Sequence, residues 1–451
     1  MLRRWLLALG VMCLAPLTLS LSSVAGSSTL GPARYIVVMK DSAPAADVAA
    51  TVTGLGATID STLGSLNTLV MSLSPRDVTR LRHDPRVAYV TADRPVRLLA
   101  GSADSAGDTG VPTGVARIGA APAVNTNGTA AAAPAHKAAV AILDTGVATR
   151  PDLNVVGGYD CAPPSSGLLD GLLGGGRNNN GNGGAGIPAD GNGHGTHVAG
   201  IVADKGIDGV VGVSPGTPLY AVRVFGADGG GEISSVICGL NWVAENATAL
   251  NIKVVNMSLG GEGTDDGKCG TTDGDAFHAA VCKVTAAGVT VVAAAGNDGG
   301  DLAKSTPAAY DEVLAVTAMA DFDGLPGGLA TTATCSAKEQ DDTAASFSDY
   351  AVPGSADAGH TIAAPGVCIT STWNDGKTKS ISGTSMASPH VAGLVARCID
   401  AGPCAKLTPA EIITKLRTDA AARPANQGFI GDPAHPIDAR YYGNLADELG
   451  Y

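Results

Sequence analysis

Mostly apolar runs of strand length alternate with helical patterns from residue 138 onward. The strand-like runs cover residues 139–143, 219–224, 254–258 and 289–295. Helical patterns near residues 198–203, 232–250 and 275–287 separate them. Buried strands that alternate with helices are typical of a parallel sheet covered on both faces. The pattern therefore predicts an α/β fold in which helices flank both faces of a mostly parallel β-sheet.

A smaller α+β unit is predicted ahead of this region, over residues 34–98. Strand patterns at residues 35–39, 68–73 and 87–90 surround two helical patterns, at residues 45–55 and 75–83. Ser74 and Pro75 form a typical helix start, with a capping hydroxyl followed by proline at the first helical position. Residues 100–110 are rich in Gly, Ser and Asp, which predicts an exposed linker.

The first 25 residues predict a secretory signal peptide. Arg3 and Arg4 precede an apolar stretch over residues 5–21, and Ser23-Val24-Ala25 supplies a small-residue cleavage site. An uncleaved membrane anchor is the alternative. The arginine pair leaves Sec and twin-arginine export open. We expect a secreted, extracellular protein that does not contact a membrane after signal removal.

Cysteine content agrees with export. Eight cysteines follow the signal, and no C-x-x-C pair is among them, which favours disulfides over a zinc site. Many connectivities remain open. We expect Cys161–Cys238, Cys269–Cys282, Cys335–Cys368 and Cys398–Cys404, of which the last closes a short loop through Gly402-Pro403.

Charge and composition narrow the class of partner. The 451-residue chain has a formal net charge of −13 and no basic run, which argues against nucleic acid. Aromatic residues make up only 4%, and there are 61 glycines, so we expect a core of small aliphatic side chains and many loops.

The most informative segment is Gly383-Thr384-Ser385-Met386-Ala387-Ser388-Pro389-His390. It predicts a buried helix that begins at Ser385, with Pro389 in the first turn. Free N–H groups and the helix dipole favour negative charge there. Such a position suits a nucleophilic serine beside a tetrahedral oxyanion.

Three further positions offer the partners that acyl transfer needs. Asp144 follows the predicted strand 139–143, where a carboxylate can orient an imidazole. His194 lies in Asp190-Gly191-Asn192-Gly193-His194-Gly195-Thr196-His197, at a predicted helix start, and is the candidate base. Asn297 follows the run at 289–295, and its amide is a candidate oxyanion donor. We expect His197 and His390 to be structural.

The four local contexts, in the order Asp, His, Asn, Ser, resemble those of the subtilisin-like serine proteases, the subtilase family or peptidase S8. The resemblance covers about residues 111–420. It implies a serine endopeptidase with an Asp144–His194–Ser385 triad, an acyl-enzyme intermediate and protein or peptide substrates. By the same resemblance, Ser258, Leu259 and Gly260 pair with substrate backbone, and Gly229, Gly230 and Gly231 form the facing edge.

Residues 34–99 resemble the inhibitory (I9-type) propeptides of this family. The resemblance implies a self-processing zymogen whose propeptide acts as intramolecular chaperone and inhibitor. We expect cleavage within the linker 100–110 and a catalytic domain over residues 111–451, and we expect a monomer. The chemistry requires no cofactor. The usual calcium loop is not matched before Gly212, and Arg150 stands where the family often has histidine, but Asp/Asn-rich stretches allow structural calcium elsewhere.

Two other hypotheses compete with this one. Gly212-Val213-Ser214-Pro215-Gly216 fits the nucleophile elbow of another hydrolase fold, which requires a strand before the serine and a helix after it. A catalytically inactive binding protein on the same fold is the second. The retention of Asp144, His194, Asn297 and Ser385 argues against it.

Overall fold

The computed structural model describes residues 32–45, 49, 58–101, 111–121, 138–162, 184–207, 209–330, 335 and 338–448. The predicted signal peptide lies outside these residues, as do most of the predicted helix 45–55, most of the linker 100–110 and residues 163–183. Among the helices within the described ranges, none is both long enough and apolar enough to span a bilayer.

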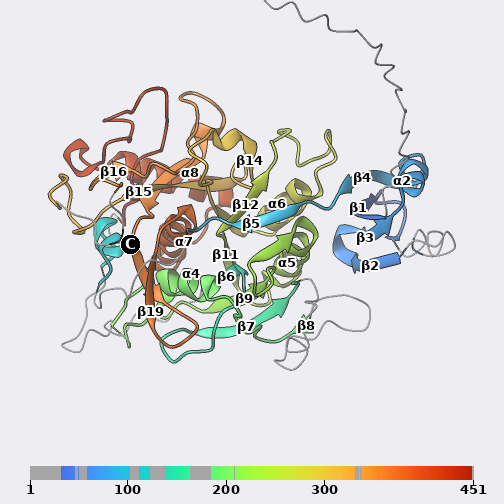
Figure 1. Cartoon of the computed structure of the whole chain (residues 1–451), viewed down its shortest axis with the longest axis horizontal. Coiled ribbons are helices and arrows are strands. Elements are labelled where there is room, and N and C mark those ends of the chain that lie inside the picture. Colours follow the sequence, from blue (N-terminus) through green and yellow to red (C-terminus); the bar gives the residue numbers. More distant parts are fainter. Residues whose placement is uncertain are drawn as a thin grey trace, which may run out of the picture. The chain divides into compact units, whose positions relative to one another are not determined.

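The predicted parallel sheet is present (Figure 1). In the described part of the chain it contains nine strands in the order β16-β15-β13-β11-β6-β9-β7-β8, with β17 beside β15. All neighbours are parallel except the short edge pairs β15–β16 and β7–β8. The strands are β6 (Ala139–Asp144), β7 (Val155–Asp160), β8 (Gly184–Ala185), β9 (Leu219–Arg223), β11 (Ile252–Met257), β13 (Thr290–Ala294), β15 (Val313–Ala320), β16 (Thr343–Ala344) and β17 (Thr361–Pro365).

Helices cover both faces of the sheet because its strands carry apolar side chains on both sides. In β6, Val140 and Ile142 belong to one core cluster, whereas Ala141 and Leu143 belong to the other. The first cluster includes residues of α4 (His194–Ala203), α7 (Thr384–Ala401) and α8 (Pro409–Ala421). The second includes residues of α5 (Ile233–Asn246) and α6 (Ala276–Ala286). The predicted α/β fold class is therefore confirmed.

The N-terminal α+β unit contains a four-stranded antiparallel sheet in the order β2-β3-β1-β4. Its elements are β1 (Ala33–Met39), β2 (Thr58–Leu63), β3 (Thr68–Leu73), α2 (Pro75–Arg82) and β4 (Val87–Ala92). Ser74 caps α2 by accepting the Asp77 N–H, and Pro75 occupies the first turn, as the sequence predicted. Ile36, Leu63 and Val70 join the core cluster of α5 and α6, so this unit packs on those helices.

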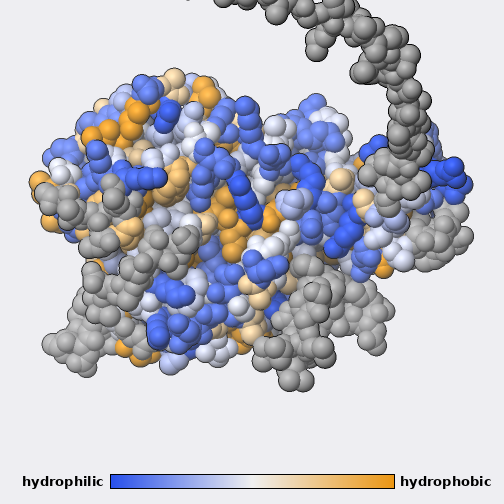
Figure 2. All heavy atoms as spheres, viewed as in Figure 1, coloured by the Kyte–Doolittle hydropathy of each residue, from blue (hydrophilic) through white to orange (hydrophobic). Residues whose placement is uncertain are grey.

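A second, antiparallel sheet joins the N-terminal unit to the larger α/β region. Strand β5 (Pro95–Leu98) lies between β10 (Gly230–Glu232) and β12 (Leu259–Glu262), and β12 also pairs with β14 (Ser305–Thr306). Figure 2 shows hydrophobic atoms gathered near the middle of the visible face, close to where Figure 1 shows β5 and β12. The remaining elements are α3 (Thr113–Arg117) and the hairpin β18 (Ile369–Thr372) and β19 (Thr378–Ile381).

The eight cysteines after the signal form four disulfides. They are Cys161–Cys238, Cys269–Cys282, Cys335–Cys368 and Cys398–Cys404, the pairs expected from the sequence. The first closes a loop of 77 residues between the end of β7 and α5, and the last closes 6 residues at the end of α7. The long loop restricts the unfolded chain more strongly than the short one does.

Candidate active site

Asp144 and His194 meet at the carboxyl edge of the sheet. Asp144 is the last residue of β6, and His194 is the first residue of α4. The imidazole Nδ1 lies 2.8 Å and 2.9 Å from the two Asp144 carboxylate oxygens, and both side chains are buried. A carboxylate in this position fixes the tautomer with its proton on Nδ1, which leaves Nε2 as the base.

Asp190 holds the loop that carries His194. Its Oδ1 accepts from the Thr145 hydroxyl at 2.8 Å and from the Asn192 and Gly193 N–H groups, while Oδ2 accepts from both the N–H and the hydroxyl of Thr196. Thr145 also donates its N–H to Asp144 Oδ1 at 2.7 Å. This carboxylate therefore links the Asp144 strand end to the start of the His194 helix.

Replacing Asp190 with asparagine is expected to lower activity about 10–100-fold, because small misplacements of a catalytic group have effects of that size. The amide NH₂ would face N–H donors that need an acceptor, and each buried donor left unpaired costs about 1–3 kcal/mol. Urea unfolding and the rate of peptide hydrolysis measure both effects. Asp375→Asn is the matched control, since Asp375 is exposed and accepts the Lys377 N–H. Equal behaviour of both variants would show that the Asp190 carboxylate does not position His194.

Ser385 is the second residue of α7, in a fully buried first turn. Its hydroxyl donates to the Ser258 carbonyl at 2.9 Å, and His194 Nε2 has no hydrogen-bond partner among the described residues. A Ser385–His194 hydrogen bond therefore requires a movement of one of these two side chains. Catalytic hydrogen bonds are often poorly aligned until the transition state is approached.

The expectation that Pro389 lies in the first turn is wrong. The helix already begins at Thr384, so Pro389 is inside it. A residue there would normally donate its N–H to the Ser385 carbonyl, and proline has no N–H to give. The Ser258 hydroxyl takes that place and donates to the Ser385 carbonyl at 2.7 Å. The helix start and the strand edge at Ser258 are thereby held together.

The carbonyl of Leu99 lies at the start of α7, where one N–H donates to it and the Asn297 amide lies nearby. The Ser385 N–H donates to this oxygen at 3.0 Å. Asn297 accepts the Thr384 N–H and hydroxyl through its Oδ1, at 3.0 Å and 2.8 Å, which leaves its Nδ2 group for another partner. A Cβ added at Gly383 would collide with the Leu99 oxygen and would lie 3.2 Å from Asn297 Nδ2. The Leu99 oxygen and the Asn297 amide therefore both lie next to Gly383.

Strand β5 is bound between the edges predicted to hold substrate. Arg97 pairs with Gly230 on one side and with Gly260 on the other, both in antiparallel register. Val96 pairs with Gly231, and Leu98 pairs with Leu259. The Leu99 N–H donates to the Ser258 carbonyl at 3.4 Å, and Gly229 lies beside Leu98. All six predicted substrate-binding residues therefore flank this extended segment.

The other predicted histidines and the rival serine have ordinary structural surroundings. His197 Nε2 lies within hydrogen-bond distance of the Ile369 and Lys379 carbonyls, and burial lowers the pKa of His197 to about 3. Burial likewise lowers the pKa of His390 to about 4, so neither competes as a base at neutral pH. Ser214 is buried, accepts the Thr217 hydroxyl and precedes β9 rather than a helix. The nucleophile-elbow hypothesis is therefore wrong.

One acidic cluster in the described part of the chain has the carboxylates that a structural calcium ion would need. Carboxylate oxygens of Asp321, Asp323 and Asp341 lie within 4.8 Å of one another. The buried guanidinium of Arg117 pairs with Asp321 at 3.0 Å and with Asp342 at 2.7 Å, so the group already contains a cation. Burial raises the pKa of Asp321 to about 7, which further reduces its negative charge. These residues therefore do not fit a calcium ion.

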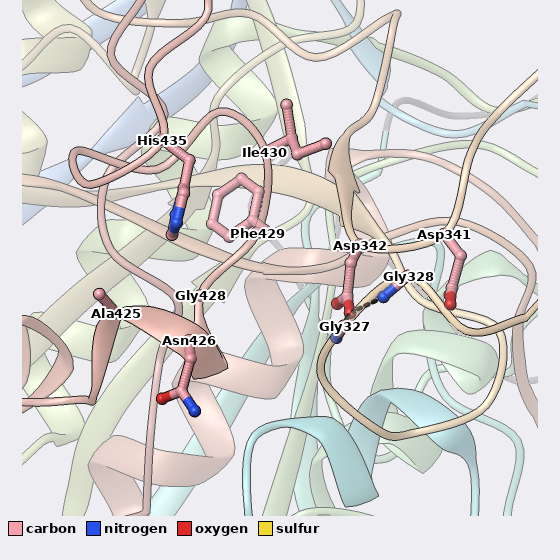
Figure 3. Close-up of a pocket in the computed structure, with 10 residues that line it drawn as sticks. All are labelled: Gly327, Gly328, Asp341, Asp342, Ala425, Asn426, Gly428, Phe429, Ile430 and His435. Atoms are coloured by element: carbon pink, nitrogen blue, oxygen red, sulfur yellow. Dashed lines mark hydrogen bonds between the residues drawn. The ribbon is translucent and has the colours of Figure 1, made fainter.

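A hollow of about 220 Å³ adjoins this group (Figure 3). Asp341 and Asp342 lie on one side of it, and Asn426 and His435 lie on the other. Asp342 accepts the Gly327 and Gly328 N–H groups as well as Arg117. The polar groups on that wall are already paired, and the hollow has no part in the arrangement around Ser385.

Sequence reasoning missed Asp190 and Leu99. Asp190 was part of the quoted histidine segment, but the local sequence does not reveal that five hydrogen-bond donors meet its carboxylate in the fold. Leu99 ends an ordinary apolar stretch, and nothing local indicates that its carbonyl reaches Ser385.

Comparison with known proteins assigns the region that contains Asp144, His194, Asn297 and Ser385 to one protein family. The model of the subtilase family matches residues 135–444. The chain is 37% identical over 331 residues to M-protease of Shouchella clausii strain KSM-K16, covering 73% of this chain and 68% of that protein. It is 31% identical over 409 residues to subtilisin E of Bacillus subtilis strain 168, covering 89% and 88%. Because that match covers 89% of this chain, it extends into the residues before 111.

Two solved structures of proteases are also similar to this chain. The S41 psychrophilic protease is 30% identical, with a TM-score of 0.55, and the match covers 76% of this chain and 99% of that one. A cold-adapted subtilisin-like serine proteinase is 27% identical, with a TM-score of 0.50, over 77% and 100%.

Proposed function

Since the chain belongs to the subtilase family and is a serine endopeptidase, we propose that it is a secreted zymogen that cleaves its own Leu99–Ala100 bond. The observation that carries this proposal is the hydrogen bond from the Ser385 N–H to the Leu99 carbonyl oxygen. A carbonyl whose oxygen accepts the N–H of the nucleophile residue is polarised for attack. The scissile bond then lies at the beginning of the linker, and Ala100 becomes the mature N-terminus.

The proposed chemistry uses Asp144, His194 and Ser385 in turn. His194 Nε2 accepts the Ser385 proton as Oγ attacks the carbonyl carbon, and the Ser385 N–H with Asn297 Nδ2 stabilises the oxyanion. His194 then gives that proton to the leaving amine, which leaves an acyl-enzyme. A water molecule loses a proton to His194, attacks the ester and releases the acid, and the proton returns to Ser385. Asp144 stabilises the imidazolium throughout, and no cofactor takes part.

The propeptide role is supported by contacts of residues 93–99. The Asp93 carboxylate accepts the N–H and the hydroxyl of Ser234, at 2.9 Å and 2.7 Å, in the first turn of α5. The N-cap residue of α5, Glu232, makes no side-chain cap of its own. A carboxylate at a helix N-terminus is favourable because it pairs free N–H groups and opposes the dipole. We infer that the propeptide assists folding of α5 and blocks the substrate edges until it is released.

Side-chain contacts of this segment indicate which residues the enzyme accepts. Leu99 is 2% exposed, and its Cδ1 lies near Gly260, where an added Cβ would approach it to 2.9 Å. Val96 is also buried, within the core cluster of β12. Arg97 is exposed and pairs with Asp298. We infer a preference for an apolar residue at the cleavage site and another three residues before it.

The test is the mass of the processed protein. Intact-mass spectrometry should find a mature chain that begins at Ala100. Leu99→Asp should slow the cut at least about 10-fold, because a carboxylate would replace an apolar side chain in a buried site. Leu99→Met is the matched control and should be processed within about 10-fold of the natural rate, since a volume-conserving swap costs under about 1.5 kcal/mol. A mature N-terminus elsewhere, or equal rates for both variants, would refute the assignment of this bond.

A further inference from the structure

A buried histidine outside the active site faces two carboxylates without forming a hydrogen bond to either. His278 lies in the first turn of α6, and its side chain is 1% exposed. Its Nδ1 lies 3.2 Å from Asp265 Oδ1 and 3.3 Å from Asp266 Oδ1. Nδ1 nevertheless has no hydrogen-bond partner in the part of the chain that the structure describes. Since both distances are short enough for hydrogen bonds, the oxygens must lie off the axis along which Nδ1 would donate.

The other edge of the ring is fixed. His278 Nε2 lies 2.9 Å from Glu312 Oε2, so a proton on Nε2 would be shared with that carboxylate. The ring also stacks on Tyr310, with 4.1 Å between ring centres and planes 3° apart. A carboxylate on one nitrogen orients an imidazole so that the other nitrogen points its lone pair at a metal ion.

The distances around Nδ1 match those between ligands of one ion. Zinc bonds to nitrogen and oxygen are about 2.0–2.2 Å long, so neighbouring ligands of a tetrahedral ion lie about 3.3–3.5 Å apart and off each other's bond axis. The Asp266 oxygen, at 3.3 Å, has this spacing, and the Asp265 oxygen, at 3.2 Å, lies slightly closer. Both lie off the Nδ1 bond axis, and all three ligand atoms lie within 4.8 Å of one another. We propose that Asp265, Asp266 and His278 bind a divalent transition metal such as zinc, with Glu312 as the outer partner of His278.

The chain also determines what else can complete this site. Cys269 and Cys282 lie close to His278, but both sulfurs belong to a disulfide and cannot act as thiolate ligands. The protein therefore supplies one nitrogen and two oxygens. Asp265 is 14% exposed, so water can take the fourth position. One nitrogen ligand favours zinc or a similar ion over calcium, which prefers oxygen alone.

The carboxylates are held in place before any ion binds. Asp266 accepts the N–H groups of Lys268, Gly270 and Thr272 and the Thr272 hydroxyl. Asp265 accepts the Gly267 N–H, and also the N–H of Asp311 next to Glu312. An ion here would tie the loop that follows β12, the start of α6 and the segment before β15 into one unit, beside the strand that pairs with β5.

The experiment uses full-length Ser385→Ala protein, which cannot digest itself by the proposed mechanism, after EDTA treatment and dialysis. Zinc titration by calorimetry should give one site per chain, and cobalt should give the visible absorption of a four-coordinate nitrogen–oxygen site. Glu312→Gln should weaken binding about 10–100-fold, as expected for an outer partner of a ligand. His278→Gln should abolish the site, and Asp265→Asn serves as a second variant if His278→Gln does not fold.

Two controls exclude other sites for the metal. His194→Gln removes the imidazole beside Asp144, and His435→Gln removes an exposed imidazole beside Asp432. Both variants should bind the metal as the parent does. Absence of binding at micromolar free zinc, or loss of binding in His194→Gln with retention in His278→Gln, would overturn the proposal. If no zinc binds, the cluster is instead an ion pair of a protonated His278 with its carboxylates.

Discussion

Replacing Ser385 with alanine is expected to slow cleavage of the Leu99–Ala100 bond about 10⁶-fold, so the variant keeps its propeptide. Removal of the nucleophile leaves no group that can form the acyl-enzyme. The Ser385 N–H and the Asn297 amide remain, so residues 93–99 should stay bound. The expected result is therefore a folded, full-length precursor with all four disulfides. Intact-mass spectrometry over time measures the cleavage, and a serine-directed fluorophosphonate probe should label the natural protein alone.

A second serine on the same helix supplies the control. Ser388 is equally buried, but its hydroxyl donates to Asn256 Oδ1 at 2.8 Å rather than to any of the proposed reacting groups. Ser388→Ala should lower the free energy of unfolding, because Asn256 loses a partner, and should still be processed. If Ser385→Ala were cut at the natural rate in the same preparation, another protease would be responsible and the self-processing proposal would fail.

Replacing Asp144 with asparagine is expected to lower kcat about 10⁴-fold. The amide has nearly the same shape, but one of its ends is a donor. The Thr145 N–H donates to Oδ1 at 2.7 Å and should retain the amide oxygen, which turns the NH₂ group toward His194 Nδ1. An NH₂ group 2.9 Å from Nδ1 opposes a proton there, which favours the tautomer with its proton on Nε2. An imidazole with its proton on Nε2 cannot take the proton of Ser385.

The rate of fluorophosphonate labelling and the rate of propeptide cleavage measure this loss. KM for a peptide should change little, because the substrate edges at residues 229–231 and 258–260 are untouched. Asp160→Asn is the matched control. Asp160 also ends a strand of the sheet, but it pairs with Arg223, with Oδ1 2.9 Å from the guanidinium Nε. That variant should lose stability and keep its labelling rate. Equal loss of labelling in both variants would show that Asp144 acts only through stability.

The sequence by itself determined the elements and the chemistry that short segments encode. Apolar runs at residues 139–143 and 289–295 predict buried strands, because a strand covered on both faces has no polar side. Ser74 and Pro75 predict a helix start, because capping depends on neighbouring residues only. The segments around Asp144, His194, Asn297 and Ser385 likewise carry their helix starts and strand ends within a few residues. Local context was sufficient to identify the family.

Only the tertiary structure decided how distant residues meet. The segment quoted for Ser385 does not reveal that Ser258, 127 positions away, satisfies the carbonyl that Pro389 leaves free. The Leu99 carbonyl reaches Ser385 through the register of β5 between two edges, which no pattern within residues 95–99 specifies. His278 faces Asp265 and Asp266 because the segment before Cys269 folds back on the start of α6. Hydrogen bonds and ligand sets depend on ångström distances across the folded chain, whereas sequence patterns record only which side chains each segment must bury.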